Sequence, residues 1–226
     1  MLGKLSGKVA LITGASSGIG AATAILFSKL GANLSLTGRN VENLQSTANA
    51  CIQGEPGQKK PLLIPADLTN ESELASLVQK TIDEFGKLDI LVNNAGVLEM
   101  GNIENTTMEQ YDRVMNVNVR SIYQLTMLAT PELIKTKGNI VNISSVNGIR
   151  SVSINYLLTL FFREITVQIQ NFFFVVLYSF QGFWLIMCPR QLWISLQDVL
   201  RYIFSLPCYY LFVYFKNSNV CLHFVA

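Results

Sequence analysis

A glycine-rich segment near the start of the chain has the residue types and spacing of a phosphate-binding loop. It runs from Thr13 to Gly20 as Thr-Gly-Ala-Ser-Ser-Gly-Ile-Gly, directly after the apolar run at residues 8–13 and at the start of a predicted helix at residues 18–30. Glycines let the backbone approach a pyrophosphate, and the free N–H groups and dipole of a helix N-terminus stabilise its charge. In this strand-turn-helix context, the segment predicts dinucleotide binding rather than a purely structural turn.

The end of the second predicted strand, at residues 33–37, bears on which dinucleotide would bind. A carboxylate there would accept hydrogen bonds from the adenosine ribose and would repel a 2′-phosphate. The sequence has Gly38, Arg39 and Asn40 at this point, with no acid and with an arginine that can pair with phosphate. This favours NADP(H) over NAD(H), although an arginine at a strand end can also be a solvated side chain.

The order of the predicted elements places these motifs in an α/β fold. Strands are predicted at residues 8–13, 33–37, 62–64, 88–92 and 138–143, and helices at residues 18–30, 41–52, 70–85 and 106–135. Strands that alternate with helices at this spacing imply right-handed crossovers and a Rossmann-like, doubly wound parallel sheet. Asn70 with Glu73, and Thr106 with Glu109, are predicted to form capping boxes at two helix starts.

The motifs in residues 5–150 resemble those of the short-chain dehydrogenase/reductase family, whose cofactor loop is Thr-Gly-x-x-x-Gly-x-Gly. The chain looks most like the soluble carbonyl and 3-oxoacyl reductases of that family. Asp67 and Leu68 follow the third predicted strand, and an Asn-Asn-Ala-Gly segment at residues 93–96 follows the fourth. The resemblance implies that Asp67 and Leu68 contact the adenine ring and that residues 93–96 line the cofactor site. Asp67 could instead cap the helix that follows it.

The loop and these segments supply the candidate binding residues. The candidates for cofactor binding are Thr13, Gly14, Ser16, Ser17, Gly18, Ile19, Gly20, Arg39, Asp67, Leu68, Asn94, Ala95 and Gly96. The resemblance also implies two catalytic residues. Asn118 would hold a water beside the active-site lysine, and Ser145 would polarise the substrate carbonyl for hydride attack. Asn118 could instead be an ordinary exposed polar residue, and Ser144 and Ser145 could simply satisfy backbone groups at a strand end.

One part of the family's chemistry is missing from the sequence. The family places a tyrosine about a dozen residues after that serine and a lysine one helical turn later, so that the lysine lowers the pKa of the phenol that protonates the forming alkoxide. Here the nearest tyrosine is Tyr156, Leu160 stands four positions after it, and no tyrosine in the chain has a lysine at that spacing. No Pro-Gly pair follows residue 150 either. We therefore expect that the chain does not catalyse as the family does.

The composition changes abruptly near residue 151, which divides the chain into an NAD(P)-binding domain at residues 1–150 and a divergent tail at residues 151–226. The first part has 26 charged and four aromatic residues, whereas the tail has six charged and 19 aromatic residues. We interpret the tail as an altered C-terminus, from a retained intron, an alternative exon or an error in gene prediction. The uncharged stretch at residues 165–189 is long enough for a membrane span but is interrupted by amides. The tail could also replace the missing sheet elements, or be poorly folded.

Charge and cysteine content argue against several other functions. The formal net charge is only +2, and the sequence has no Lys/Arg-rich run and no zinc-type Cys/His spacing, so neither a nucleic-acid partner nor a metal site is predicted. The four cysteines form no CxxC pair and are predicted to be reduced, and the polar N-terminus predicts a cytoplasmic location. Family members usually pair through the long fourth helix and the catalytic helix. Loss of the catalytic helix therefore puts a homo-oligomer in doubt.

Overall fold

The computed structural model describes residues 4–53, 59–101 and 104–144, together with five short strands in the C-terminal third. The backbone divides into two compact units. The first comprises Met1–Ala95 and Arg120–Ile140, and the second comprises Gly96–Val119 and Val141–Ala226. The division at residue 150 that the composition suggests stays a prediction.

A five-stranded sheet organises the first unit. Its strands are β1 (Val9–Thr13), β2 (Asn33–Gly38), β3 (Leu62–Pro65), β4 (Ile90–Asn93) and β5 (Asn139–Asn142), in the order β3-β2-β1-β4-β5. The pairs β1·β2, β1·β4 and β2·β3 are all parallel. This order confirms the predicted Rossmann-like sheet, because the chain winds outward from β1 in both directions.

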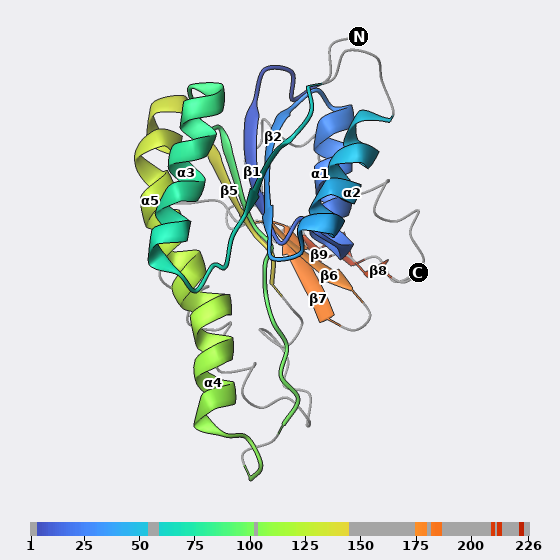
Figure 1. Ribbon diagram of the computed structural model, residues 1–226. Helices are drawn as coiled ribbons and strands as arrows, with labels where there is room; N and C mark the ends of the chain where they lie inside the picture. Colours follow the sequence, from blue (N-terminus) through green and yellow to red (C-terminus); the bar gives the residue numbers. More distant parts are fainter. Residues whose placement is uncertain are drawn as a thin grey trace. The chain divides into compact units, whose positions relative to one another are not determined.

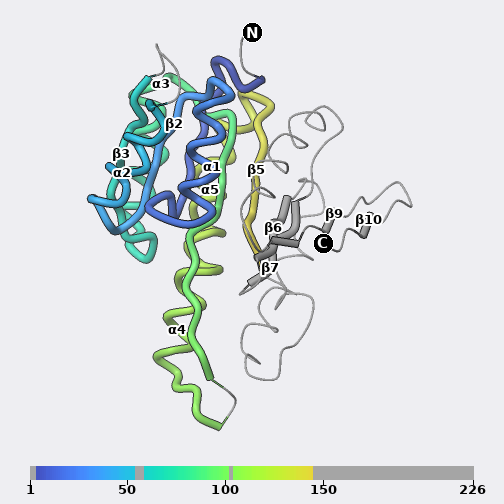
Figure 2. Tube along the Cα trace, turned by 90° about the vertical axis from the view of Figure 1, so that its right-hand side faces the viewer, coloured from blue at the N-terminus to red at the C-terminus, as the bar shows by residue number. Residues whose placement is uncertain are grey.

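Helices cover both faces of this sheet. The helices α1 (Gly18–Lys29) and α2 (Val41–Ile52) lie on one face, and α3 (Glu71–Phe85) and α5 (Ser121–Thr136) lie on the other (Figure 1). Figure 2 shows the same arrangement from the side on which α1 and α2 face the viewer. The core lies between the sheet and the second pair of helices, where leucines of β1, α3, β4 and α5 are almost fully buried: Leu11, Leu74, Leu77, Leu91, Leu125 and Leu133. Every residue of β1 is buried, which explains why its apolar run shows no alternation.

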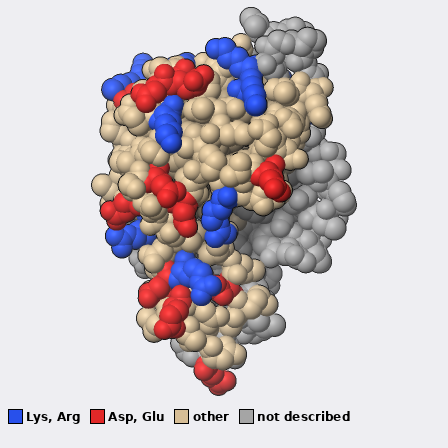
Figure 3. Space-filling model, in the orientation of Figure 1, with Lys and Arg blue, Asp and Glu red and all other residues tan. Residues whose placement is uncertain are grey.

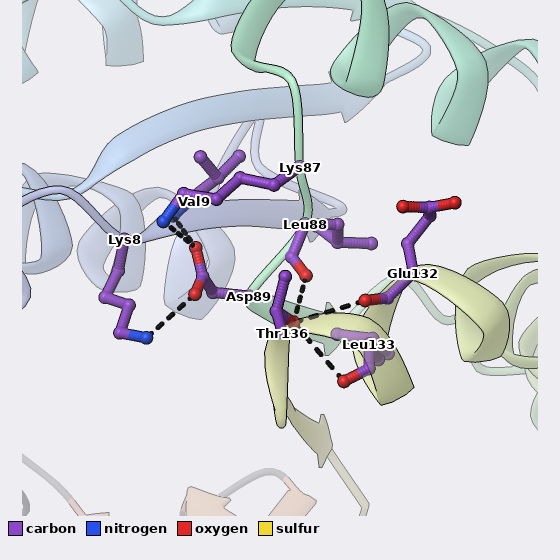
Figure 4. A network of polar contacts seen from close by, with 8 residues as sticks. All are labelled: Lys8, Val9, Lys87, Leu88, Asp89, Glu132, Leu133 and Thr136. Carbon is purple, nitrogen blue, oxygen red and sulfur yellow. Dashed lines mark hydrogen bonds and ion pairs between the residues drawn. The ribbon is translucent and has the colours of Figure 1, made fainter.

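A buried carboxylate joins the beginning of β1 to the beginning of β4. Asp89, whose side chain is 3% exposed, accepts hydrogen bonds from Lys8 Nζ (2.8 Å) and Val9 N (3.0 Å) and pairs with Lys87 Nζ (3.0 Å) (Figure 4). Burial alone would raise the pKa of Asp89, but the hydrogen bonds from Lys8, Lys87 and Val9 outweigh it, so that the pKa lies below its ordinary value. Thr136 of α5 donates to the carbonyl of Leu88 (2.7 Å), which ties the same corner to the helix layer.

The start of α3 differs from the prediction. Asn70 is the N-cap, and its side chain accepts a hydrogen bond from Ser72 N (3.1 Å). Glu73 does not reach the backbone N–H of Asn70, which donates to the Asp67 carbonyl (3.1 Å). Instead, Glu73 accepts from Asp67 N (2.7 Å) and from Asn70 Nδ2 (2.9 Å). The predicted capping box is therefore wrong, and Glu73 braces the turn before the helix.

The second unit begins with a helix whose start also differs. Thr107 and Gln110, not Thr106 and Glu109, form the capping box of α4 (Met108–Met115). The predicted long helix at residues 106–135 is three successive elements: α4, the π-helical turn η1 (Asn116–Arg120), and α5 of the first unit. A π-helical turn inserts a residue into the helical repeat and often marks a functional position.

The described strands of the C-terminal third form a second sheet in the second unit. Its strands are β6 (Val175–Ser179), β7 (Gly182–Ile186), β8 (Tyr209–Tyr210), β9 (Phe212–Val213) and β10 (Leu222–His223), in the order β10-β9-β7-β6-β8. The sequence also predicts a helix at residues 157–170 and a strand from Phe172 to Tyr178. The first range lies outside the described residues, and the second overlaps β6. Within the described stretches, no helix is both long enough and apolar enough to cross a membrane.

Candidate nucleotide-binding site

The glycine-rich loop connects β1 to α1 and depends on two glycines for different reasons. Gly14 and Gly18 have φ of 64° and 54°, the left-handed region that favours glycine. A Cβ atom on Gly14 would lie 2.8 Å from Asn94 Nδ2, whereas a Cβ atom on Gly18 would meet no atom of the described residues within 4 Å. Gly14 is therefore required by packing inside the protein, while the space around Gly18 is open to a ligand.

The N-terminus of α1 has the properties of an anion site. The N-cap Ser17 is exposed, and its side chain makes no hydrogen bond to the first turn, which contains no acidic residue. In α3, by contrast, Asn70 caps the first turn and Glu71 and Glu73 lie within it. The first N–H groups of a helix have no partners inside the helix and attract negative charge. The residues of the loop therefore fit a bound phosphate.

A single hydroxyl connects the loop to the end of β4. Thr13, which is 1% exposed, accepts hydrogen bonds at Oγ1 from Asn94 N (2.9 Å) and Ala95 N (3.0 Å), and donates to Val92 O (3.2 Å). Asn94 returns two bonds, from Nδ2 to Thr13 O (2.9 Å) and to Gly14 O (3.2 Å). The structure thus brings the loop together with Asn94 and Ala95, two of the residues selected from the sequence.

Gly20 packs against the same contact. A Cβ atom there would overlap the carbonyl oxygen of Gly14 and would lie 2.5 Å from Asn94 Nδ2. Gly20 has an ordinary helical conformation, so close approach, rather than φ, requires the glycine. Gly20, the third glycine of the motif, therefore lets α1 start in close contact with the loop. Ile19, which lies between Gly18 and Gly20, is half-buried.

The end of β2 lies against the loop. A Cβ atom on Gly38 would be 3.1 Å from Ser16 Oγ, which places the residue after Gly38 beside the loop. That residue, Arg39, is exposed and forms no ion pair within 4 Å with any described residue. Asn40 is the N-cap of α2 and accepts from Asn43 N (2.8 Å). Arg39 is therefore the charged side chain that this strand end offers.

The end of β3 supplies Asp67 and Leu68. Asp67 Oδ1 accepts hydrogen bonds from Thr69 N (2.9 Å) and Thr69 Oγ1 (2.8 Å). These bonds, and to a smaller degree the Arg39 guanidinium, hold the pKa of Asp67 below its ordinary value. Asp67 is not the cap of α3, because Asn70 fills that position. Leu68 packs against the hydrophobic core, so at least part of its role is structural.

Asn118 forms a separate arrangement in the second unit. Its side chain, in η1, accepts from Val97 N (2.8 Å) and donates to Val97 O (2.8 Å), and the residue is 6% exposed. A Cβ atom on Gly96 would lie 3.3 Å from Asn118 Oδ1. The side-chain amide therefore holds the segment at Gly96 and Val97 in place, and the water-holding role stays a prediction. Ser145 lies outside the described residues, and Ser144, the residue before it, is half-buried.

Of two buried polar side chains near the loop, Asn93 belongs to the predicted segment at residues 93–96, whereas Thr37 was not predicted as a site residue. Asn93 Nδ2 donates to Thr126 Oγ1 (3.2 Å), which links the end of β4 to α5. Thr37 pairs with Thr13 in the sheet and is fully buried, and its hydroxyl has no hydrogen-bond partner among the described residues. The only sequence signal for Thr37 is a polar residue at the end of an apolar strand, a pattern too common to single it out.

Charges elsewhere on the described surface are mixed. On the face shown in Figure 3, Lys and Arg side chains alternate with Asp and Glu, without a large area of one sign. The one described cysteine, Cys51, is a free and buried thiol whose pKa burial raises to about 11, so it stays protonated near neutral pH. Neither feature adds a second reactive site to the described part of the chain.

Known proteins are similar to the same part of the chain. The profile of the short chain dehydrogenases matches residues 8–156. The chain is 39% identical over 147 residues to 3-oxoacyl-(acyl-carrier-protein) reductase of Thermotoga maritima, covering 65% of this chain and 58% of that protein. It is 36% identical over 154 residues to dehydrogenase/reductase SDR family member 7 of Mus musculus, covering 67% of this chain and 46% of that protein.

A solved structure agrees with this result. The apo form of glucose dehydrogenase from Caenorhabditis elegans matches with a TM-score of 0.58 and 42% sequence identity, covering 63% of this chain and 56% of that one. The chain thus spans about half the length of the relatives it matches. Proteins of this kind use nicotinamide dinucleotides and act on carbonyl or alcohol substrates. With the parallel sheet, the loop and the family match in agreement, the chain belongs to the short-chain dehydrogenase/reductase family.

Proposed function

We propose that this chain binds a nicotinamide dinucleotide at the loop between β1 and α1, and that it prefers NADP(H) to NAD(H). The observation that carries the proposal is the exposed N-terminus of α1, where the Ser17 side chain caps nothing and the space around Gly18 is open. Backbone N–H groups from Ser17 to Gly20 would hold the pyrophosphate. Thr13 and Asn94 keep the loop in the shape that this requires.

The preference for NADP(H) rests on the end of β2. Arg39 is exposed beside Ser16 and Gly38, its guanidinium is not held by an ion pair with a described residue, and no acid occupies the strand end. A guanidinium pairs well with a phosphate dianion, and a 2′-hydroxyl would gain little from it. Asp67 and Leu68 would lie on the adenine side of the same site.

The ancestral reaction is hydride transfer between NADP(H) and a carbonyl or secondary alcohol, and the bound dinucleotide would supply or accept the hydride. In that reaction Ser145 would polarise the carbonyl and Asn118 would organise water. The sequence contains no tyrosine with a lysine four positions later. Loss of a general acid costs about 10²–10⁴-fold in rate. We therefore propose that the chain binds the dinucleotide with little or no turnover of the family type.

Titration of the full chain with NADPH and NADH, followed by nucleotide fluorescence, tests the binding proposal. We expect saturable binding of both, with the lower dissociation constant for NADPH. Absence of saturation with either dinucleotide would contradict the proposal and would favour a non-functional or membrane-associated isoform. A cytoplasmic location stays a prediction.

Turnover of a generic diketone tests the second half of the proposal. We expect none above background with NADPH. Turnover that the Ser145→Ala variant abolishes would instead identify the chain as an active enzyme. Sequencing of the transcript across the codons for residues 145–160 tests the origin of the tail, since a sole transcript that encodes it would exclude a retained intron or an alternative exon.

A further inference from the structure

The ends of β2 and β3 bring two opposite charges to one edge of the sheet. Gly38 pairs with Pro65, and the Ala66 N–H reaches the Gly38 carbonyl (3.4 Å). Arg39 directly follows β2, Asp67 is the second residue after β3, and both are exposed. A guanidinium and a carboxylate therefore leave adjacent strands at the place where the adenosine end of a dinucleotide is proposed to bind.

The Asp67 carboxylate is fixed in this position. One of its oxygens, Oδ1, accepts both the backbone and the hydroxyl hydrogen bond of Thr69 (2.9 and 2.8 Å). Glu73, the second acid of this turn, accepts from the backbone N–H of Asp67 (2.7 Å). The carboxylates of Asp67 and Glu73 are therefore both held by hydrogen bonds between the end of β3 and the start of α3.

Arg39 and Asp67 interact electrostatically but do not form an ion pair with each other, so neither side chain occupies the hydrogen-bonding groups of the other. They form no ion pair within 4 Å, yet the guanidinium contributes to the lowered pKa of the carboxyl. A 2′-phosphate that pairs with Arg39 brings about 1.5 to 2 negative charges into the field of the same carboxylate. Repulsion between like charges falls only as the inverse of distance and is weakened by salt. A 2′-hydroxyl carries no charge and does not experience this repulsion.

We propose that Asp67 is a specificity-determining residue, because its carboxylate offsets the charge of Arg39 at the 2′-position and thereby weakens the preference for NADP(H) over NAD(H). The inference rests on the proposed dinucleotide site and adds to it. If the Asp67 carboxylate were absent and Arg39 alone faced the ribose, the discrimination between the two dinucleotides would be sharper. In this chain the Asp67 carboxylate, in the turn after β3, weakens that discrimination.

The Asp67→Asn variant tests the inference, since it removes the charge and keeps an oxygen that can accept from Thr69 N–H. The readout is the ratio of the dissociation constants for NADH and NADPH, measured by fluorescence titration of the full chain. Both dinucleotides share the adenine ring, so a lost adenine contact cancels in the ratio. We expect the ratio to rise about threefold to tenfold at low salt and the rise to shrink near 1 M salt.

The Glu84→Gln variant is the matched control. It removes the same charge from an exposed position in the last turn of α3, away from the strand ends. We expect its ratio to equal that of the unmodified chain. A ratio that does not rise in Asp67→Asn, or that rises equally in the control, would overturn the inference while leaving saturable binding intact. Failure of the unmodified chain to bind either dinucleotide would instead overturn the proposed function and this inference with it.

A measurement without nucleotide keeps the inference testable if Asp67→Asn does not fold. The Asp67 carboxyl can be titrated by carbon-detected NMR in the unmodified chain and in Arg39→Gln. We expect the pKa of Asp67 to be higher in the variant, because a favourable positive charge has been removed. An unchanged pKa would mean that the two side chains do not sense each other and would refute the inference.

Discussion

Replacing Thr13 and Thr37 by valine, one at a time, compares two buried threonines that pair with each other on neighbouring strands. Both residues are at most 1% exposed, and the substitution changes a hydroxyl to a methyl group in each case. The difference lies in the partners. Thr13 Oγ1 makes three hydrogen bonds, two of them with backbone N–H groups of Asn94 and Ala95, whereas Thr37 Oγ1 makes none with a described residue.

The partners decide the expected free energies of unfolding. Thr13→Val leaves two half-buried N–H groups without their acceptor, at about 1–3 kcal/mol for each group that water cannot reach, so we expect a loss of about 2–4 kcal/mol. Thr37→Val removes a buried hydroxyl that has no hydrogen-bond partner among the described residues, so we expect no loss and a gain of up to about 1 kcal/mol. Thr13→Ser keeps the hydroxyl and should lose only about 1 kcal/mol for the missing methyl group.

Urea denaturation followed by far-ultraviolet circular dichroism measures these differences, and NADPH titration of the same samples reports on the loop. Thr13→Val should also bind NADPH more weakly, because Asn94 and Ala95 lose their anchor, whereas Thr37→Val should bind it as the unmodified chain does. Equal stability of the two valine variants, within about 0.5 kcal/mol, would refute the claim that the Thr13 hydroxyl organises the site.

Four further substitutions test other parts of the structure. Gly20→Ala should weaken NADPH binding at least about tenfold, because its Cβ atom overlaps the loop. Gly86→Ala, at the C-cap of α3 and outside the loop, should cost about 1 kcal/mol of stability from its positive φ and leave NADPH binding unchanged. Equal effects of the two variants on NADPH titration would contradict this. Asp89→Asn should lower the free energy of unfolding by about 1–3 kcal/mol at pH 7. Folding lowers the pKa of Asp89, so the stability difference between the unmodified chain and Asp89→Asn should be fully present above about pH 4. It should vanish as the pH falls through the folded-state pKa. A stability difference that stays constant in urea denaturation from about pH 2 to 7 would contradict this role of the carboxylate. Asn118→Leu should lower the free energy of unfolding by about 1–3 kcal/mol, because it breaks both hydrogen bonds to Val97. Unchanged hydrogen exchange at the Val97 amide would contradict a stabilising role for these bonds.

The sequence predicts the sheet well because its strands are buried apolar runs bounded by turn residues. It predicts the start of α4 less well for a specific reason. Thr106 and Thr107 stand together, with Glu109 and Gln110 three residues after each, so two overlapping capping boxes satisfy the same pattern. Only the structure shows that Thr107 and Gln110 form the box.

Contacts between residues that are far apart in the sequence cannot be predicted from local sequence patterns. Asp89 receives its hydrogen bonds from Lys8 and Val9, about 80 positions earlier, and no spacing rule connects them. The two hydrogen bonds between the Asn118 side chain and Val97 could not be predicted either, because η1 departs from the regular helical repeat. The glycine loop was predictable because its chemistry depends on consecutive residues.

The most direct test of the account is calorimetric titration of the unmodified full chain with NADPH, alongside Gly20→Ala at the same concentration. The account predicts one saturable site per chain for the unmodified protein and a markedly weakened site in the variant, without turnover of added diketone in either. Heat changes that do not saturate, or binding that Gly20→Ala leaves intact, would contradict the assignment of the loop as a dinucleotide site.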